Sequence, residues 1–480
     1  MCREKKKLKK PEIHLTADSG WMNDPNGFSY YKGQYHMFYQ YHPFSSIWGP
    51  MHWGHAVSKD LIHWSYLPVA LVPDMKYDKD GCFSGNAISL SDEKQVLIYT
   101  GVKNEIQTDG SVKGVQTQCL AIGDGITYEK YKDNPVITEM DIPNGFSRYD
   151  FRDPTIWKKK DGTYCSLVAN RAPNGSGQVL LFKSKDIFKW KYEKVFIKND
   201  FRYGTMWECP DFFELDNNAV FVVSPMDIKE ENAEGYNGNG TLCLIGSYDE
   251  DADVFDEKSG HLIDYGIDFY APQTVEAPDG RKIMIGWMQN WDSCNLRVDE
   301  TDWYGQMSVP RELSIQNNRL IQWPIQELDD LRCNKVEYKN IVFTGEKRFD
   351  GIYGRIVDLE IQIESEDSQK LFEIFELRFA QNDVHYTSLK YLPGHNKVEI
   401  NRELSGYERA IINKRHCKVK NQSGHIKFRI IMDRYSVEVF INDGEQVMTS
   451  TIYTEQDARD ISFIVQGNIK MHIVKYDLKA

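Results

Sequence analysis

Several features that define large classes of protein are missing from this sequence of 480 residues. No run of apolar residues is long enough to cross a bilayer, and no apolar segment follows the N-terminal lysines to make a secretory signal. The nine cysteines are scattered singly, without a CxxC pair, which fits reduced thiols in a cytosol better than a disulfide framework. We therefore expect a cytoplasmic protein without a membrane partner.

Positive charge is also scarce. The formal net charge of −13 argues against nucleic acid as the main partner, because phosphate groups are bound by basic faces. The one basic run, "REKKKLKK", lies within residues 1–10. We interpret this segment as a solvated N-terminal tail rather than a targeting or nucleic-acid-binding segment.

Common catalytic and metal-binding motifs are absent as well. The sequence has no Gly-rich phosphate loop and no G-x-S-x-G nucleophile elbow. His52 and His55 in "MHWGH" lack the spacing of a zinc-binding helix, so structural histidines are the better interpretation. Nothing in the sequence calls for a metal or another cofactor.

A unit repeated five times dominates the first two thirds of the chain. Each copy opens with a short motif strand, and the five are "WMNDPNGFSYY", "CFSGNAISL", "YDFRDPTIW", "WECPDFFEL" and "YAPQTVEA". A polar turn, a second strand and a third strand follow, although the third strand of the last copy, "GQMSVPREL", is less clear. These short β-branched and aromatic runs, separated by Gly, Asn and Asp, are typical of strands joined by turns.

Such repeats predict the fold class, which is all-β. Small sheets repeated around an axis form a propeller whose first strands line a central channel. We therefore expect a five-bladed β-propeller over residues 11–325. An array of β-sandwiches is the alternative, but it does not explain one motif strand in each repeat.

The pattern changes after "LIQWPIQELDDL", and residues 326–334 are expected to form a linker. From 335 to 480 apolar and polar residues alternate, which predicts a separate β-sandwich. The sequence Asn442-Asp443-Gly444 is a strong hairpin signal. Beside it Val437, Val439 and Ile441 should face a core, while Glu438 should point away from it.

Three of the motif strands carry an acid at matching places: Asp24, Asp153 and Glu208. If these strands line one channel, the three side chains meet at its mouth and repel one another, which raises the pKa of at least one. Carboxylates with separated pKa values suit the acid and nucleophile roles of glycoside hydrolysis. Each acid alone could instead cap a turn or pair with a neighbour, but three together favour a site.

The residues around the acids suit a sugar, whose C–H faces pack on aromatic rings. Six tryptophans lie in or beside the channel-facing segments: Trp21, Trp48, Trp53, Trp207, Trp287 and Trp291. Asn23, Gln40, Ser84 and Arg152 offer hydrogen bonds to sugar hydroxyl groups. The expected partner is therefore a small-molecule sugar.

At these residues the sequence resembles glycoside hydrolase family 32, which contains invertases, fructanases and sucrose-6-phosphate hydrolases. The motifs that carry the resemblance are "WMNDPNG", "FYQYHP", "WGHAVSKDLIHW", "GCFSGNA", "FRDP", "WECPD", "FYAPQT" and "DRYSVEVFINDGE". They occur in order over nearly the whole chain, which makes the resemblance highly specific.

The resemblance implies a five-bladed propeller joined to a β-sandwich and a retaining β-fructofuranosidase. It implies that Asp24 is the nucleophile, Glu208 the acid/base and Asp153 the transition-state stabiliser. The positions that would line the fructose subsite are Asn23, Gln40, Trp48, Phe83, Ser84, Arg152 and Trp287. The expected substrates are sucrose, sucrose 6-phosphate or short fructo-oligosaccharides, and Glu208 should be protonated at rest.

Three alternatives remain open at this point. A fructosyltransferase would use a sugar acceptor instead of water, a non-catalytic protein would only bind carbohydrate, and an inverting relative would need more widely spaced carboxyl groups. Sucrose cannot be separated from sucrose 6-phosphate, since Arg148, Arg171 and Arg202 are all plausible phosphate ligands. The oligomeric state is open too.

Overall fold

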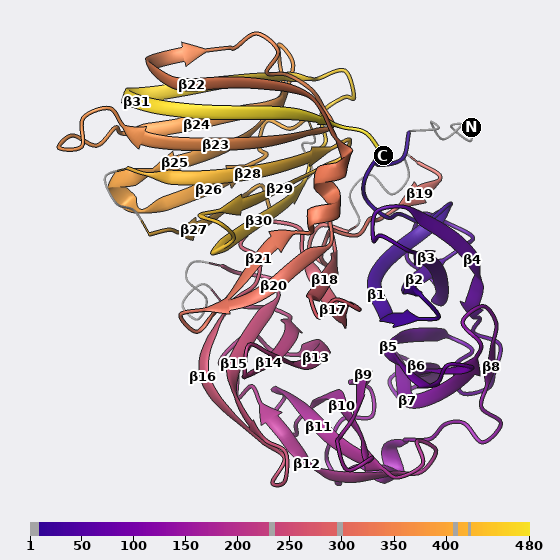
Figure 1. Ribbon diagram of the computed structural model, residues 1–480. Helices are drawn as coiled ribbons and strands as arrows, with labels where there is room; N and C mark the ends of the chain where they lie inside the picture. Colours follow the sequence, from indigo (N-terminus) through magenta and orange to yellow (C-terminus); the bar gives the residue numbers. More distant parts are fainter. Residues whose placement is uncertain (1–8, 230–235, 295–300, 407–410, 421–423) are drawn as a thin grey trace.

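The computed structural model describes residues 9–229, 236–294, 301–406, 411–420 and 424–480. The predicted basic tail therefore lies outside the described residues, except for its last two. A ring of small sheets and a second, larger β-structure lie side by side (Figure 1). Among the described residues no helix has the length and apolarity needed to span a membrane.

Five sheets form the ring, and each runs outward from the centre as a meander. The first consists of β1 (Gly20–Tyr31), β2 (Gln34–His42), β3 (His52–Ser58), β4 (Trp64–Leu71) and β19 (Trp303–Tyr304). The second consists of β5 (Gly81–Ser91), β6 (Lys94–Ile106), β7 (Val112–Gly123) and β8 (Tyr128–Lys130). The third consists of β9 (Phe151–Lys158), β10 (Tyr164–Arg171), β11 (Gly177–Ser184) and β12 (Trp190–Lys198).

The remaining two sheets complete the predicted five-bladed propeller. The fourth consists of β13 (Trp207–Leu215), β14 (Asn218–Pro225), β15 (Leu242–Asp249) and β16 (Val254–Leu262). The fifth consists of β17 (Tyr270–Glu276), β18 (Lys282–Trp287), β20 (Arg311–Gln316) and β21 (Arg319–Pro324). The first strands of the blades, β1, β5, β9, β13 and β17, surround the central axis (Figure 1).

The fifth blade differs from the prediction in its third strand. The sequence placed that strand at 305–313, but β20 begins at Arg311, directly after Pro310. The preceding residues link two blades instead, because the Met307 N–H donates to the Leu15 carbonyl and the Ser308 N–H to the Gly286 carbonyl. Just before them, β19 pairs with β1 in parallel. This pairing closes the ring between the last blade and the first.

Neighbouring blades are held together by apolar side chains that alternate along their strands. Between the third and fourth blades, for example, Leu167 and Leu181 pack in one buried cluster with Trp207 and Phe221. Fully burying one such side chain contributes about 1.5–3 kcal/mol, so a ring of these clusters fixes the inner strands relative to one another. The channel-facing side chains are therefore carried on a rigid frame.

A 3-10 helix, Gln326–Leu331, leads from the propeller into the predicted β-sandwich. Its strands are β22 (Arg332–Lys347), β23 (Val357–Ser365), β24 (Ile374–Gln381), β25 (Thr387–Leu392), β26 (Lys397–Asn401), β27 (Lys414–Lys418), β28 (Ile426–Asp433), β29 (Ser436–Ile441), β30 (Gln446–Thr451) and β31 (Asp460–Leu478). The predicted hairpin at 442–444 joins β29 to β30.

The long strand β31 connects the two layers of the sandwich. Its first part pairs with β24 and its second part with β23, while β22 follows its other edge. The change of partner occurs around Gly467, which has φ of +97°. A Cβ atom there would lie 2.8 Å from the Phe372 Cα, so glycine is required at this corner.

A group of buried charged residues joins the two domains, and we call it the interdomain seam. Arg311 of the propeller donates to Glu438 of the sandwich at 2.6 Å and to Asp264 at 3.1 Å, and Arg402 of the sandwich donates to Asp268 at 2.6 Å. His14 contacts Asp433 at 2.8 Å and Glu438 at 3.1 Å. Members of the seam are Asp264, Asp268, Arg311, Arg402, Asp433, Glu438 and His14.

The two faces of β29 contact different parts of the protein. Val437, Val439 and Ile441 belong to the sandwich core, as predicted, and Glu438 points the other way. However, Glu438 is completely buried rather than solvated, because its face of β29 is covered by the propeller. The two domains therefore share a single interior.

Candidate active site

Every first strand of the propeller contains a β-bulge at its motif. The pairing register shifts between Met22 and Pro25 in β1, between Phe83 and Gly85 in β5, and between Glu208 and Asp211 in β13. The other two shifts lie opposite the segments 153–154 and 271–272. A bulge bends a strand and turns a side chain out of the regular alternation, so the motif residues are redirected at the same level of the channel.

The composition of the motifs explains why the bulges form. A proline follows the key position in four of the five motifs: Pro25, Pro154, Pro210 and Pro272. Proline has no N–H for the strand ladder, and within sheets it is confined to edges and bulges. Three preceding residues, Asp153, Cys209 and Ala271, have φ of 61°, 50° and 50°, a left-handed conformation that is strained for ordinary side chains.

The bulges bring the three predicted acids together. Asp24, Asp153 and Glu208 all line one pocket of about 290 Å³ near the axis. The complete lining is Asn23, Asp24, Gln40, Trp48, Met51, Phe83, Ser84, Gln116, Tyr149, Asp150, Arg152, Asp153, Glu208 and Trp291. Residues from all five blades thus meet in a single small cavity.

Asp24 is the acid with the fewest partners. Its Oδ2 accepts hydrogen bonds from Ser84 Oγ at 3.0 Å and from the Cys209 thiol at 3.7 Å. Its Oδ1 is buried and has no hydrogen-bond partner among the described residues. Burial raises the pKa of Asp24 to about 7, and the charges of Glu208 and Asp153 add to the shift.

Asp153 is held through its backbone as well as its side chain. Its N–H donates to Thr100 Oγ1 at 2.9 Å, and its Oδ2 accepts from the Cys209 N–H at 3.0 Å. Burial raises the pKa of Asp153 to about 6, since the opposing charge of Arg152 only partly offsets it and Glu208 adds to it. A left-handed residue on one strand is thereby bonded to a left-handed residue on the next.

Glu208 is surrounded by hydrogen-bond donors. Arg152 Nε and Nη2 donate to its Oε1 at 3.0 and 2.8 Å. Its Oε2 accepts from the Tyr270 hydroxyl at 2.7 Å and from Trp291 Nε1 at 3.3 Å. The two oxygens therefore differ: one faces a cation, and the other faces neutral groups.

Arg152 is the one cation that lines the pocket in the described part of the chain. Besides Glu208 it contacts Asp150 at 3.1 Å and Asp153 at 3.8 Å. Burial alone would lower the pKa of this guanidinium, but the charges of Glu208, Asp153 and Asp150 raise it. Arg152 is therefore permanently charged and fully engaged by the acids around it.

Most of the predicted subsite residues lie where the sequence suggested. Asn23, Gln40, Trp48, Phe83, Ser84 and Arg152 all line the pocket. Trp48 is 43% exposed and its ring lies edge-on to Phe83 with the centroids 6.1 Å apart. These two rings form an apolar wall beside the acids.

Trp287 departs from the expectation. It is fully buried, does not line the pocket and packs behind Trp291 with the ring centroids 5.2 Å apart. It ends β18, the second strand of its blade, so it faces the space between blades rather than the channel. Trp21, Trp53 and Trp207 are likewise buried and do not line the pocket, which leaves Trp48 and Trp291 as its tryptophans.

Comparisons with known proteins identify the family to which this architecture belongs. Residues 14–324 match the glycosyl hydrolases family 32 N-terminal domain, and residues 327–480 match the glycosyl hydrolases family 32 C terminal domain. The chain belongs to glycoside hydrolase family 32. It is therefore a glycoside hydrolase by family, with the propeller and sandwich that its sequence predicted.

Individual relatives of this family 32 chain share its full length. A sucrose-6-phosphate hydrolase of Escherichia coli is 36% identical over 96% of this chain and 92% of the relative. A raffinose invertase of Escherichia coli is 35% identical over 94% of this chain and 91% of the relative. The solved structure of a Bombyx mori β-fructofuranosidase superposes with a TM-score of 0.82 at 33% identity, over 98% of this chain and 94% of that one.

Sequence reasoning missed several groups of this family 32 pocket. Met51, Gln116, Tyr149 and Asp150 line it, and Tyr270 reaches Glu208 from behind. Tyr149, Asp150 and Tyr270 fall within the repeated motif segments but were not singled out there, whereas Met51 precedes β3 and Gln116 lies on β7, the third strand of its blade. The signal that was available is the proline found in four of the five motifs, since a proline within a strand marks a bulge.

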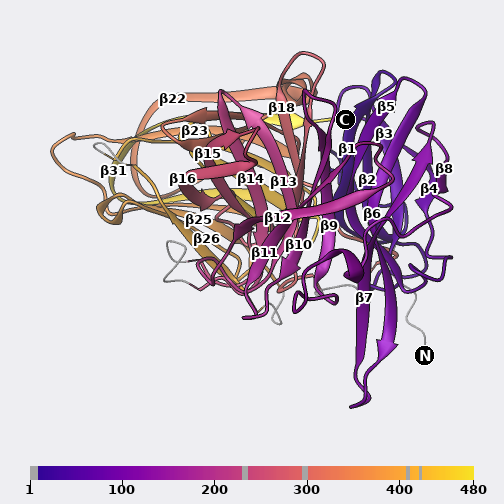
Figure 2. The same ribbon diagram turned by 90° about the horizontal axis from the view of Figure 1, so that it is seen from below.

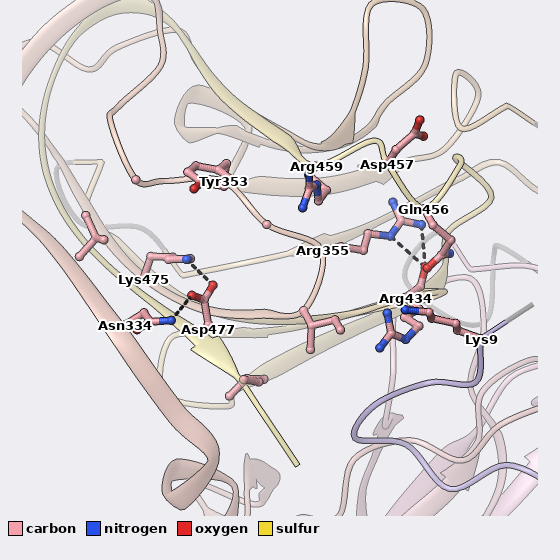
Figure 3. A pocket seen from close by; sticks show the side chains of 15 residues that line it. Lys9, Asn334, Tyr353, Arg355, Arg434, Gln456, Asp457, Arg459, Lys475 and Asp477 are labelled. Atoms are coloured by element: carbon pink, nitrogen blue, oxygen red, sulfur yellow. Dashed lines mark hydrogen bonds and ion pairs between the residues drawn. The ribbon is translucent and has the colours of Figure 1, made fainter.

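A larger hollow of about 830 Å³ lies on the sandwich, but it does not suit this chemistry (Figure 3). Two of its cations are bonded to the protein: Arg355 donates to the Arg434 carbonyl at 2.7 Å, and Lys475 forms an ion pair with Asp477. Asp477 also accepts from Asn334 at 2.9 Å. The hollow therefore has no counterpart to the pair of facing carboxyl groups near the axis.

Proposed function

We propose that this protein is a retaining β-fructofuranosidase that hydrolyses the terminal β-fructofuranosyl bond of sucrose, sucrose 6-phosphate or short fructo-oligosaccharides. One observation carries the proposal: a buried carboxylate oxygen without a partner, Asp24 Oδ1, shares a small pocket with Glu208 and Asp153. The printed activities of the relatives, a sucrose-6-phosphate hydrolase, an invertase and a β-fructofuranosidase, support the same substrate class.

The roles follow from the contacts of each acid. Asp24 Oδ1 is free to attack the anomeric carbon of the fructosyl group while Glu208 gives its proton to the departing oxygen, which leaves a covalent fructosyl-enzyme. Glu208, now a carboxylate, takes a proton from water, whose oxygen then displaces Asp24. Asp153 is held by the Cys209 N–H, and it stabilises the positive charge of the transition state through the fructose hydroxyl groups.

The contacts of Glu208 distinguish its two oxygens in the proposed proton transfer. Arg152 occupies Oε1, so the proton belongs on Oε2. The Tyr270 hydroxyl lies 2.7 Å from this atom and 3.1 Å from the Ser224 carbonyl. It can therefore donate to Ser224 while Glu208 is protonated and turn to donate to Glu208 after the proton has left.

A fructosyltransferase is the second candidate, since it would share every step up to the fructosyl-enzyme. The two differ in the acceptor, which is water or a second sugar. The names of the relatives favour water. The free thiols of the eight described cysteines agree with the proposed cytoplasmic location.

The proposal is tested by the stereochemistry and by a leaving-group comparison. Proton NMR of the first fructose released from sucrose should show the β-anomer, and release of the α-anomer would contradict a double displacement. Glu208→Gln should reduce turnover of sucrose by at least about 1000-fold but spare a fructoside with a good aryl leaving group. Equal losses on both substrates would remove Glu208 as the acid, and Asp109→Asn, at the exposed turn between β6 and β7, serves as the control.

A further inference from the structure

The pocket carries an excess of negative charge. Among the residues described, its lining contains four carboxylates, Asp24, Asp150, Asp153 and Glu208, against the single guanidinium of Arg152. Arg152 already donates to Glu208 and to Asp150 and lies near Asp153. Its donors are directed at protein groups, so it is not available to a second anion.

The three arginines that the sequence offered as phosphate ligands are also paired. Arg148 lies 2.6 Å from Glu105 and 3.7 Å from Glu139. Arg171 lies 2.8 Å from Asp150 and donates to the Gly175 carbonyl at 3.1 Å. Arg148 is thus paired with two carboxylates, and Arg171 shares Asp150 with Arg152.

The third arginine follows the same pattern, since Arg202 lies 2.6 Å from Glu257. A phosphate monoester is bound best by arginines whose paired N–H groups point at it without a competing carboxylate. None of the three meets that condition. To bind a phosphate, each would have to give up an ion pair.

One further cation reaches the mouth of the pocket. Lys113 on β7 lies 5.2 Å from the ring of Tyr149, and the Arg148 guanidinium lies 5.0 Å from the same ring. The β6–β7 ribbon that carries Lys113 extends beyond the rest of the second blade (Figure 2). The ring of Tyr149 therefore holds both cations, and in the described part of the chain Lys113 is the one exposed cation that we find beside the acidic lining of the pocket.

We propose that this pocket selects the unphosphorylated sugar, so that sucrose, and not sucrose 6-phosphate, is its substrate. The inference rests on the proposed function and specifies in addition that the substrate is uncharged. The 6-phosphate group carries nearly two negative charges at neutral pH and would meet an acidic pocket whose arginines are occupied. The repulsion opposes both encounter and binding, although an Escherichia coli relative is a sucrose-6-phosphate hydrolase.

The test compares kcat/KM for the two sugars with the purified full chain. We expect sucrose to be preferred at least tenfold at low ionic strength, with the preference narrowing as salt screens the repulsion. Equal rates, or a preference for sucrose 6-phosphate, would overturn the inference while leaving the proposed function intact. Hydrolysis of neither sugar would overturn the inference, and a lack of activity on a short fructo-oligosaccharide as well would overturn the proposed function itself.

A variant that releases one arginine sharpens the test. Glu105→Gln removes the carboxylate nearest Arg148 and should raise the rate on sucrose 6-phosphate relative to sucrose at least threefold. The matched control is Glu364→Gln, which removes the same charge from a pair with Lys470 at 3.0 Å on the sandwich and should leave the ratio unchanged. A preference for sucrose that neither salt nor Glu105→Gln alters would overturn the electrostatic cause and thus the proposal.

Discussion

Two groups of buried acids, the active-site pocket and the interdomain seam, are built in opposite ways. In the seam Glu438 accepts from Arg311 and His14, and although burial opposes it, these partners lower the pKa of Glu438. In the pocket burial and neighbouring acids raise the pKa of Asp24 to about 7. The same residue types thus join two domains where cations match them, and retain reactivity where they do not.

The two regions also differ in how far the hydrogen-bonding capacity of their acids is used. Glu438 uses its oxygens on Arg311, His14 and the Val309 N–H, and Asp433 accepts from the Glu12 and Ile13 N–H groups. Asp24 Oδ1 instead has no partner among the described residues. Stability is gained where every buried polar atom is satisfied, and a reactive group is one that the fold leaves incomplete.

The largest expected effect comes from neutralising the incomplete acid. Asp24→Asn should lower kcat on sucrose by about 10,000-fold or more, because the amide cannot form the fructosyl-enzyme. The same variant should melt at a higher temperature than the wild type at pH 8, because the raised pKa of Asp24 means that its ionisation opposes folding.

The sign of this stability effect fixes its pH dependence. The contribution of Asp24 is fully present below pH 3.8, where the group is protonated in both states, and is lost as the pH rises through about 7. The advantage of Asp24→Asn should therefore disappear towards pH 4. Calorimetry across this range measures it, and a variant that is less stable at pH 8 would show that the pocket is not strained.

Breaking the seam should have the opposite outcome. Arg311→Met leaves Asp264 buried without its arginine and Glu438 with His14 as its remaining cation, which should lower the free energy of unfolding by about 3–5 kcal/mol. The kcat of the molecules that remain folded should be close to normal, since the seam lies outside the pocket lining. Denaturant titration and active-site titration separate the two quantities.

A surface pair provides the control for the seam. Arg348 contacts Asp460 at 2.7 Å, but both side chains are about half exposed, at 53% and 50%. Arg348→Met should change the free energy of unfolding by less than about 1 kcal/mol, because exposed ion pairs contribute little. Similar losses in both variants would show that burial does not distinguish the seam.

A pH-dependent effect on the seam concerns His14, whose pKa is raised to about 9. Burial lowers this pKa, but the hydrogen bonds to Asp433 and Glu438 outweigh it. A raised histidine contributes stability that is complete below pH 6.5 and is lost as the pH rises through about 9, to a total of about 3 kcal/mol. His14→Gln should flatten the fall in stability over this interval, and an unchanged slope would contradict the assignment.

The sequence predicted much of this architecture because repetition carries long-range information. Five matching motif strands imply five equivalent blades, so Asp24, Asp153 and Glu208 could be brought together without knowing any distance between them. The alternation around Val437 likewise identified a core face. Residues at equivalent positions of a repeated strand can therefore be placed at equivalent positions in the fold.

The repeated pattern could not predict the positions of loop residues or the contacts between domains. The family resemblance implied that Trp287 lines the fructose subsite, but the tryptophan of this region that lines the pocket is Trp291, on the loop after β18. Glu438 was identified as facing away from the sandwich core, yet nothing local in the sequence says that Arg311 of another domain covers it. Loops and domain contacts depend on residues far apart in the chain, which no local period encodes.

The parallel pairing of β19 with β1 has a consequence for biosynthesis. Asp24, the proposed nucleophile, lies on the first strand of the propeller, but Gly20 and Trp21 of that strand pair with Trp303 and Tyr304, which are made only after three further blades and the first two strands of the fifth. A nascent chain can stack its blades one by one, but the ring of blades cannot close until β19 has been synthesised. Catalytic competence is thus deferred to the end of propeller synthesis, however early its first acid is made.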